Sequence, residues 1–99
     1  MKDLKQKIGS AVKTGKLVLG SKNVIRLLLN GTAKLIILSN NCPRETKERI
    51  IYYCKLAGVS YRVTEISGLE LGAACRKPFN VSALAVIEQG DSTIMDLAD

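Results

Sequence analysis

The sequence predicts an α/β fold, a three-layer α/β/α sandwich with a central mixed sheet of about four strands. Segments with helical and strand periodicity alternate along the chain, and the connections between them are short. The stretch 33–39 is nearly all apolar, as expected of a strand covered on both faces. With 99 residues, of which 46% are hydrophobic, the chain can bury one modest core. We therefore expect a single domain over residues 1–99.

The chain opens on an amphipathic helix. Apolar residues between Leu4 and Val12 recur at helical spacing, with lysines at several of the remaining positions, and Thr14 and Gly15 close the helix. Residues 16–19 then form a short apolar strand. We expect the helix to pack one face on the sheet.

The second helix begins directly after Gly20. It covers residues 21–29 and stops at Asn30 and Gly31, a pair suited to a helix C-terminus. The apolar run 33–39 follows, and we expect it to lie at the centre of the sheet.

A third helix follows the polar loop 40–42. The fixed φ of Pro43 suits its first turn, and Glu45 and Glu48 complement the helix dipole. Apolar residues at helical spacing give this helix a buried side, and Gly58 caps its end.

The next two elements are a strand and a short helix. Residues 59–63 alternate between apolar and polar, which predicts a half-buried strand with its odd-numbered positions inward. Ser67 and Glu70 have the spacing of a capping box for a short helix over residues 68–75.

The chain closes on a strand and a helix. Residues 82–87 are another apolar strand, and Asp91 or Ser92 is a suitable cap for a last short helix. The sequence contains no linker, internal repeat or low-complexity stretch. The whole pattern is five helices alternating with four strands.

The turn at Gly20 has the features of an anion-binding site. A helix that starts there exposes its first backbone N–H groups, which carry partial positive charge. Gly20 allows a ligand to approach closely, and Lys22 and Arg26 share one helical face beside those N–H groups. An ordinary strand-to-helix turn with solvated charges would have the same sequence.

The charge of the chain is distributed unevenly. Residues 1–44 hold nine of the fifteen Lys and Arg residues and one acid, a net charge of +8, whereas residues 45–99 have a net charge of −2. This asymmetry favours a polyanionic partner, with nucleic acid ahead of an anionic membrane because no segment resembles an interfacial anchor. A generally basic, solvated surface remains the alternative.

The loop 76–81 supplies an aromatic residue among polar neighbours. Phe79 is the only phenylalanine in the chain, and it lies between two basic residues and Asn80. Such a ring can stack on an unpaired base in distorted RNA, or it can fold back as a lid on the core. Both loops adjoin strands, and in an α/β fold such loops can gather at one end of the sheet.

The sequence argues against an enzyme. It has no histidine, no complete Walker loop and no dinucleotide glycine motif. The three cysteines are odd in number and widely spaced, so neither a zinc site nor a disulfide framework fits, and Cys54 and Cys75 are expected to be buried thiols. We expect no metal and no cofactor. The absence of a signal peptide or spanning segment predicts a cytoplasmic protein.

Five blocks of the sequence form a recognisable series: residues 14–20 (TGKLVLG), 33–37 (AKLII), 52–53 (YY), 70–72 (ELG) and 81–86 (VSALAV). In this order they resemble the ribosomal protein thirty family of the archaeal and eukaryotic large subunit, part of the kink-turn RNA-binding superfamily. The resemblance covers essentially the whole chain. It implies an α/β/α sandwich that binds kink-turns, which are sharply bent helix-internal-loop-helix elements of RNA.

The resemblance also implies which residues contact RNA. In this family the contacts come from the glycine turn with the helix after it, the loop after the central strand, and the loop before the last strand. Carried over by position, they fall on Gly20, Lys22, Asn23, Arg26, Asn41, Phe79, Asn80 and Val81. Many relatives have Asn and then Glu second and third after the glycine, where this chain has Lys22 and Asn23.

We therefore expect a structural RNA-binding protein of the large ribosomal subunit, monomeric when free, that recognises a kink-turn in rRNA. In this mechanism Lys22 and Arg26 neutralise phosphates, Asn23 and Asn41 hydrogen-bond bases or sugars, and Phe79 with Val81 packs on an extruded base. An alternative is a kink-turn adaptor of another ribonucleoprotein, such as a guide-RNA modification complex or ribonuclease P. A nucleotide enzyme and an interaction module using the acidic C-terminal end are the remaining alternatives.

Overall fold

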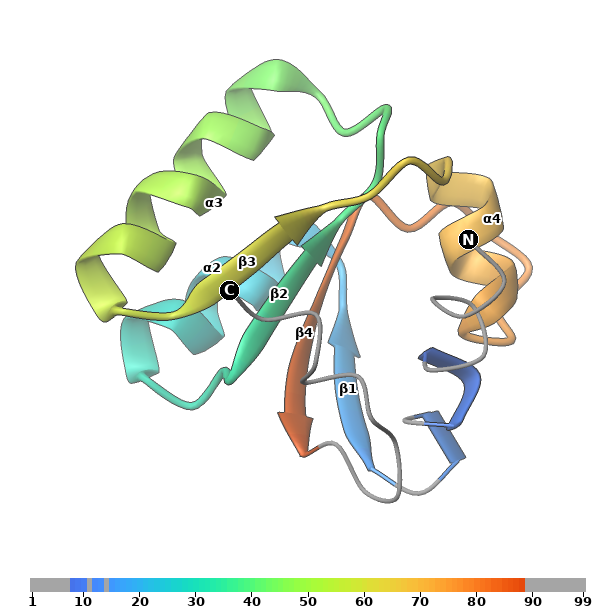
Figure 1. Ribbon diagram of the computed structural model, residues 1–99, viewed down its shortest axis with the longest axis horizontal. Helices are drawn as coiled ribbons and strands as arrows, with labels where there is room; N and C mark the ends of the chain where they lie inside the picture. The colour runs from blue at the N-terminus through green and yellow to red at the C-terminus, as the bar shows by residue number, and fades with distance from the viewer. Residues whose placement is uncertain (1–7, 11, 14, 89–99) are drawn as a thin grey trace.

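The computed structural model describes residues 8–10, 12–13 and 15–88, and it has a four-stranded sheet between two helical layers (Figure 1). The strands are β1 (Lys16–Leu19), β2 (Leu35–Leu38), β3 (Ser60–Val63) and β4 (Ala83–Glu88). The helices are α2 (Ser21–Asn30), α3 (Arg44–Ala57) and α4 (Gly68–Ala74). Residues 8–10 and 12–13, within the expected first helix, are also helical. The expected last helix and its caps lie outside the described residues.

The sheet is mixed, with the strand order β1-β4-β2-β3. β4 runs antiparallel to both of its neighbours, β1 and β2, whereas β2 and β3 are parallel. β2 is therefore one of the two inner strands, as its apolar run predicted. The predicted fold class, a three-layer sandwich around a mixed sheet, is confirmed.

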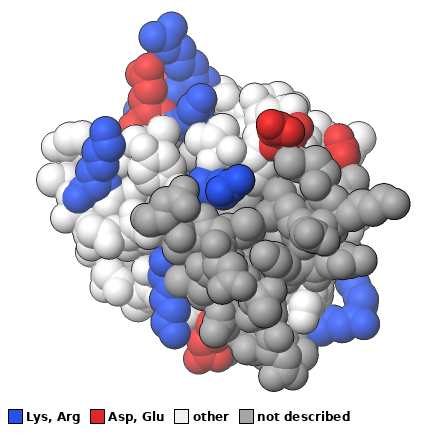
Figure 2. Space-filling view, in the orientation of Figure 1, with Lys and Arg blue, Asp and Glu red and all other residues white. Residues whose placement is uncertain are grey.

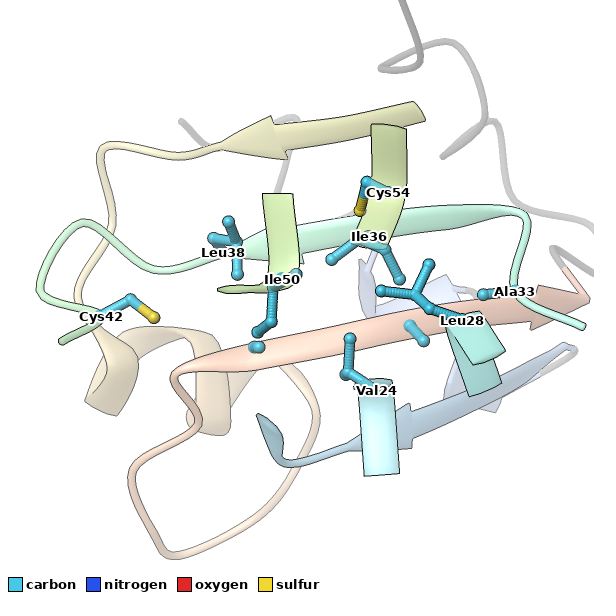
Figure 3. Close-up of a cluster of buried hydrophobic side chains, with 10 residues drawn as sticks. Val24, Leu28, Ala33, Ile36, Leu38, Cys42, Ile50 and Cys54 are labelled. Carbon is cyan, nitrogen blue, oxygen red and sulfur yellow. The ribbon is translucent and has the colours of Figure 1, made fainter. Parts of the chain in front are cut away.

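Alternate residues of β2 supply two separate cores. Ile36 and Leu38 pack under α2 and α3, together with Val24 and Ile50 (Figure 3). On the other face, a second cluster joins the sheet to α4 and to Ile8; it comprises Ile8, Leu35, Ile37, Ile66, Leu71, Cys75, Val81, Leu84 and Val86. Since a strand alternates its side chains between the two faces, the continuous apolar run of β2 serves both cores.

The predicted helix ends agree with the structure to within one residue. Gly31 (φ 72°) and Gly58 (φ 70°) adopt the left-handed conformation at the ends of α2 and α3. Ser67 caps α4, since its Oγ accepts a hydrogen bond from the Glu70 amide at 3.2 Å. Pro43 was expected in the first turn of α3, but it is the N-cap residue, one position earlier. Its ψ of 138° is extended and not helical.

The prediction for the third strand was wrong at its end. Val63 was expected to point inward, but its side chain is 39% exposed, and the next residue, Thr64, is buried instead. The Thr64 hydroxyl donates a hydrogen bond to the Leu38 carbonyl at 2.9 Å. β3 is an outer strand with a neighbour on one side only, so its last residue lacks the cover that an inner strand receives.

Four connections lie at the same end of the strands, and we call this region the loop edge. It comprises the residues after β1 (20–21), β2 (39–43) and β3 (64–67) and those just before β4 (79–82). Backbone bonds tie these connections together, from the Gly20 amide to the Ala83 carbonyl at 3.0 Å and from the Ser39 amide to the Ser82 carbonyl at 2.9 Å. The connections thus meet on one side of the molecule, as the sequence suggested they could.

Candidate nucleic-acid interface

The first turn of α2 exposes its backbone N–H groups at the loop edge. Gly20 is the N-cap residue, with a φ of 99° that favours glycine, and no side chain caps the helix. The first turn contains no acidic residue that would neutralise the partial positive charge of this end. The predicted anion-binding features are therefore present in the backbone.

The three side chains predicted on this helix are exposed. Lys22 and Arg26 lie one turn apart on the solvent side of α2. Asn23 is turned back toward the strand, and its Nδ2 donates a hydrogen bond to the Leu19 carbonyl at 3.1 Å. Because an amide nitrogen carries two hydrogens, Asn23 keeps a second donor for a ligand.

A groove of about 300 Å³ joins the Gly20 turn to the Phe79 loop. It is lined by Leu19, Gly20, Ser21, Phe79, Asn80, Val81 and Ser82. The Phe79 side chain is 50% exposed, so the ring is not a lid buried on the core. The two loops that the sequence singled out therefore form the walls of one groove.

Val81 and Asn80 differ in their surroundings. Val81 lines the groove, but it is 2% exposed and belongs to the core cluster that contains Leu71 and Leu84, so almost none of it is accessible for the predicted packing on a base. Asn80 is exposed, but its side chain also lies against Gly68 at the start of α4. Of the two apolar residues Phe79 and Val81, Phe79 is thus the one that a ligand can reach.

Asn41 lies on the loop edge but does not line the groove. Its Oδ1 accepts hydrogen bonds from the Ser39 hydroxyl at 3.0 Å and from the Gly68 amide at 2.9 Å. The side-chain oxygen therefore holds the loop after β2 against the start of α4. Any contact of Asn41 with a ligand would use its amide hydrogens.

Lys22 and Arg26 follow the Gly20 turn on α2, whereas Lys77 of the loop before β4 lines a separate pocket together with Lys16. On the face shown in Figure 2, described basic side chains lie at separate places, some of them beside acidic ones. Arg44, for example, pairs with Glu48 at 3.0 Å on the surface of α3. The positive charge of the first half of the chain is thus spread over several elements.

The sequence also matches a known family model over nearly its whole length. Residues 2–96 match the model of the ribosomal protein L7Ae/L30e/S12e/Gadd45 family. The chain belongs to this family. The resemblance inferred from the sequence blocks is therefore confirmed.

Curated members of the L7Ae/L30e/S12e/Gadd45 family give the same result. The large ribosomal subunit protein eL30 of Methanocaldococcus jannaschii is 43% identical over 97 residues, covering 98% of this chain and 88% of the relative. The eL30 protein of Pyrobaculum islandicum is 43% identical over 99 residues, covering 100% of this chain and 98% of the relative. These relatives are ribosomal proteins and not enzymes, so the expectation that this L7Ae/L30e-family chain is not an enzyme is confirmed.

A solved structure shares the L7Ae/L30e-type fold of this chain. It is described as a protein with unknown function from Bacillus halodurans C, and it superposes with a TM-score of 0.77 at 26% sequence identity. The superposition covers 87% of this chain and 84% of the other. The three-layer arrangement is therefore found in an experimental structure as well.

Among residues 8–10, 12–13 and 15–88, no three His, Cys, Asp or Glu residues are grouped so as to hold a metal ion. Cys42, Cys54 and Cys75 are all buried, and burial raises the pKa of Cys54 and of Cys75 to about 11. No described helix has the length and apolar character needed to cross a bilayer.

Two features of the loop edge escaped the sequence reasoning. Ser21 and Ser82 line the groove, and Gly68 and Gly72 of α4 lie directly under the Phe79 loop. The serines carry no signal in the sequence, because serine is common in loops. Two glycines four residues apart in a predicted helix are a signal, since glycine is disfavoured there without a reason such as close packing.

Proposed function

We propose that this chain is a structural RNA-binding protein of the large ribosomal subunit and that it recognises a kink-turn in rRNA through the groove between Gly20 and Phe79. The observation that carries the proposal is the groove itself, which joins an open helix N-terminus to a half-exposed aromatic ring. The names of the curated relatives support the ribosomal assignment.

The Gly20 side of the groove would bind the RNA backbone. The uncapped N–H groups of α2 attract an anion, and Lys22 and Arg26 add full positive charges beside them. Gly20 has no side chain, so a phosphate or sugar can approach the peptide backbone closely.

The Phe79 side of the groove would bind a base. A-form RNA hides its base edges in a deep, narrow groove, so a protein can stack on a base only where the duplex is bent or interrupted. Phe79 offers a ring for an extruded base, and Asn23, Asn41 and Asn80 offer amide groups for bases or sugars. A kink-turn supplies both partners at once, a sharply bent backbone and unstacked bases.

The remaining parts of the proposal concern the whole protein. Residues 1–99 would act as one RNA-binding domain that is monomeric when free and works in the cytoplasm, on the ribosome. The eL30 relatives, matched over 88% and 98% of their own lengths, support the assignment to the ribosome.

The proposal is tested by filter binding with a kink-turn RNA and a straightened mutant of equal length at the same salt concentration. We expect the kink-turn RNA to bind at least about tenfold more tightly, a difference of about 1.4 kcal/mol. The control variant is Leu56→Ala. Leu56 is exposed near the end of α3, and it lies at the opposite end of the strands from the groove. This variant should bind both RNAs like the wild type.

Equal affinity for the bent and straightened RNAs would contradict kink-turn recognition. Sequencing the RNA captured by the protein from a cell extract then separates the two ribonucleoprotein assignments. Recovery of rRNA supports the ribosomal role, whereas recovery of guide RNAs or ribonuclease P RNA would favour an adaptor of another particle.

A further inference from the structure

The Phe79 loop lies on a face of α4 that has no side chains. Gly68 and Gly72 are four residues apart, so they share one face of this helix. A Cβ atom built on Gly72 would overlap the Phe79 carbonyl oxygen and would lie 3.2 Å from the Phe79 carbonyl carbon. One built on Gly68 would lie 2.8 Å from Cγ of Asn80 and overlap its Oδ1. The loop therefore sits closer to the helix than any other residue type would allow.

Hydrogen bonds fasten the loop to the same two glycines. The Lys77 amide donates to the Gly72 carbonyl at 2.9 Å, where the loop leaves α4. The Val81 amide donates to the Gly68 carbonyl at 2.9 Å, where the loop enters β4. Phe79 lies between these two points, so its backbone position is fixed by bonds at both ends and by contact in the middle.

The start of α4 is itself fixed to the loop edge. The Gly68 amide donates to Asn41 Oδ1 at 2.9 Å, and the Asn40 side chain donates to the Glu65 carbonyl at 2.9 Å. The start of α4 is therefore held in place by bonds that do not involve the Phe79 loop. Moving the loop away from the helix would move the Phe79 ring relative to Gly20, across the groove.

We propose that Gly68 and Gly72 are positioning residues for the RNA site, whose close contact with the Phe79 loop holds the aromatic ring at the groove. The expected effect of the glycines on RNA affinity rests on the proposed function. The position of the Phe79 ring, however, can be measured in the free protein. The two glycines act through Phe79 and do not themselves touch the RNA.

The first test uses 4-fluorophenylalanine, because the chain contains a single phenylalanine and will give one ¹⁹F resonance, that of residue 79. Gly72→Ala should move or broaden this resonance in the free protein. The matched control is Gly9→Ala, also in a helical segment, where a Cβ would have the Ala74 carbonyl oxygen at an ordinary 3.8 Å. The control resonance should coincide with that of the wild type.

The second test measures kink-turn affinity in two backgrounds. Gly72→Ala should weaken binding about tenfold when Phe79 is present, because stacking of a base on one aromatic ring is worth about five- to 150-fold in affinity. In a Phe79→Ala background the same substitution should change affinity by less than about twofold, since residues that act through one contact are not additive.

A third variant pair keeps the inference testable if Gly72→Ala does not fold. Gly68→Ala should shift the ¹⁹F resonance because its methyl group meets the Asn80 side chain, and combining it with Asn80→Ala removes the obstructing atoms. The double variant should then give the resonance of Asn80→Ala alone.

Each contrary result has a distinct meaning. Unmoved ¹⁹F resonances in Gly72→Ala and Gly68→Ala would overturn the inference, whatever the RNA result. A tenfold loss that persists without Phe79 would also overturn it, because the glycine would then act by another route. If the wild type fails to prefer the kink-turn RNA while the resonances move as expected, the proposed function fails and the positioning of the ring stands.

Discussion

Phe79 presents a half-exposed ring beside the uncapped end of α2. If the ring stacks on a base, Phe79→Ala should weaken kink-turn binding by about 1–3 kcal/mol. Filter binding at constant salt measures the change. Leu56→Ala, which removes an exposed apolar side chain at the opposite end of the strands, should leave the affinity unaltered. Unchanged affinity in the Phe79 variant would remove this residue from the site.

Lys22 is exposed one residue after the start of α2. Contact with one phosphate releases about one counterion, so Lys22→Ala should make the plot of log K against log salt shallower by about one unit. The control is Lys55→Ala, because Lys55 lies in the last turn of α3, away from the groove. An identical slope in wild type and Lys22→Ala would show that this side chain does not touch the RNA backbone.

At the scale of elements, α4 is the shortest of the three helices within residues 15–88, and it depends on its cap. Ser67 Oγ accepts a hydrogen bond from the Glu70 backbone amide at 3.2 Å, and the Ser67 hydroxyl donates one to Glu70 Oε1 at 3.3 Å. We expect Ser67→Ala to lower the free energy of unfolding by about 0.5–2 kcal/mol, because a helix amide loses its partner. Urea unfolding measures the loss. Ser67→Thr keeps a hydroxyl at the cap and should cost less; an equal loss in both variants would argue against a capping role.

At the scale of the whole molecule, both cores contain buried cysteines, Cys54 on the inner side of α3 and Cys75 at the C-cap of α4. Burial raises the pKa of each thiol from 9.0 to about 11. The folded state therefore favours the protonated thiol, and this contribution to stability is complete below pH 9 and is lost as the pH rises from about 9 to about 11.

We accordingly expect the urea midpoint of the wild type to fall between pH 8 and about 10. Cys54→Val removes one of the two thiols, so its midpoint should fall less over the same range. A midpoint that falls equally in both proteins would show that the decline comes from other groups.

Several elements were predictable because their causes are local. The left-handed caps at Gly31 and Gly58, the Ser67 cap and the two-faced burial of β2 follow from residues within a few positions of one another. The exposure of Val63 was not predictable, because it depends on β3 being an outer strand. The close packing of Phe79 on Gly72 likewise depends on how α4 is placed.

The sequence alone determined the alternation of helices and strands, the open turn at Gly20, the basic first half and the family of the chain. Only the tertiary structure decided that β4 lies between β1 and β2, and this order brings the Phe79 loop next to the Gly20 turn. Strand order depends on pairing between residues far apart in the chain, such as Leu19 with Leu84. Periodicity and caps report the local preferences of a segment, and they contain no information about which distant segment it will meet.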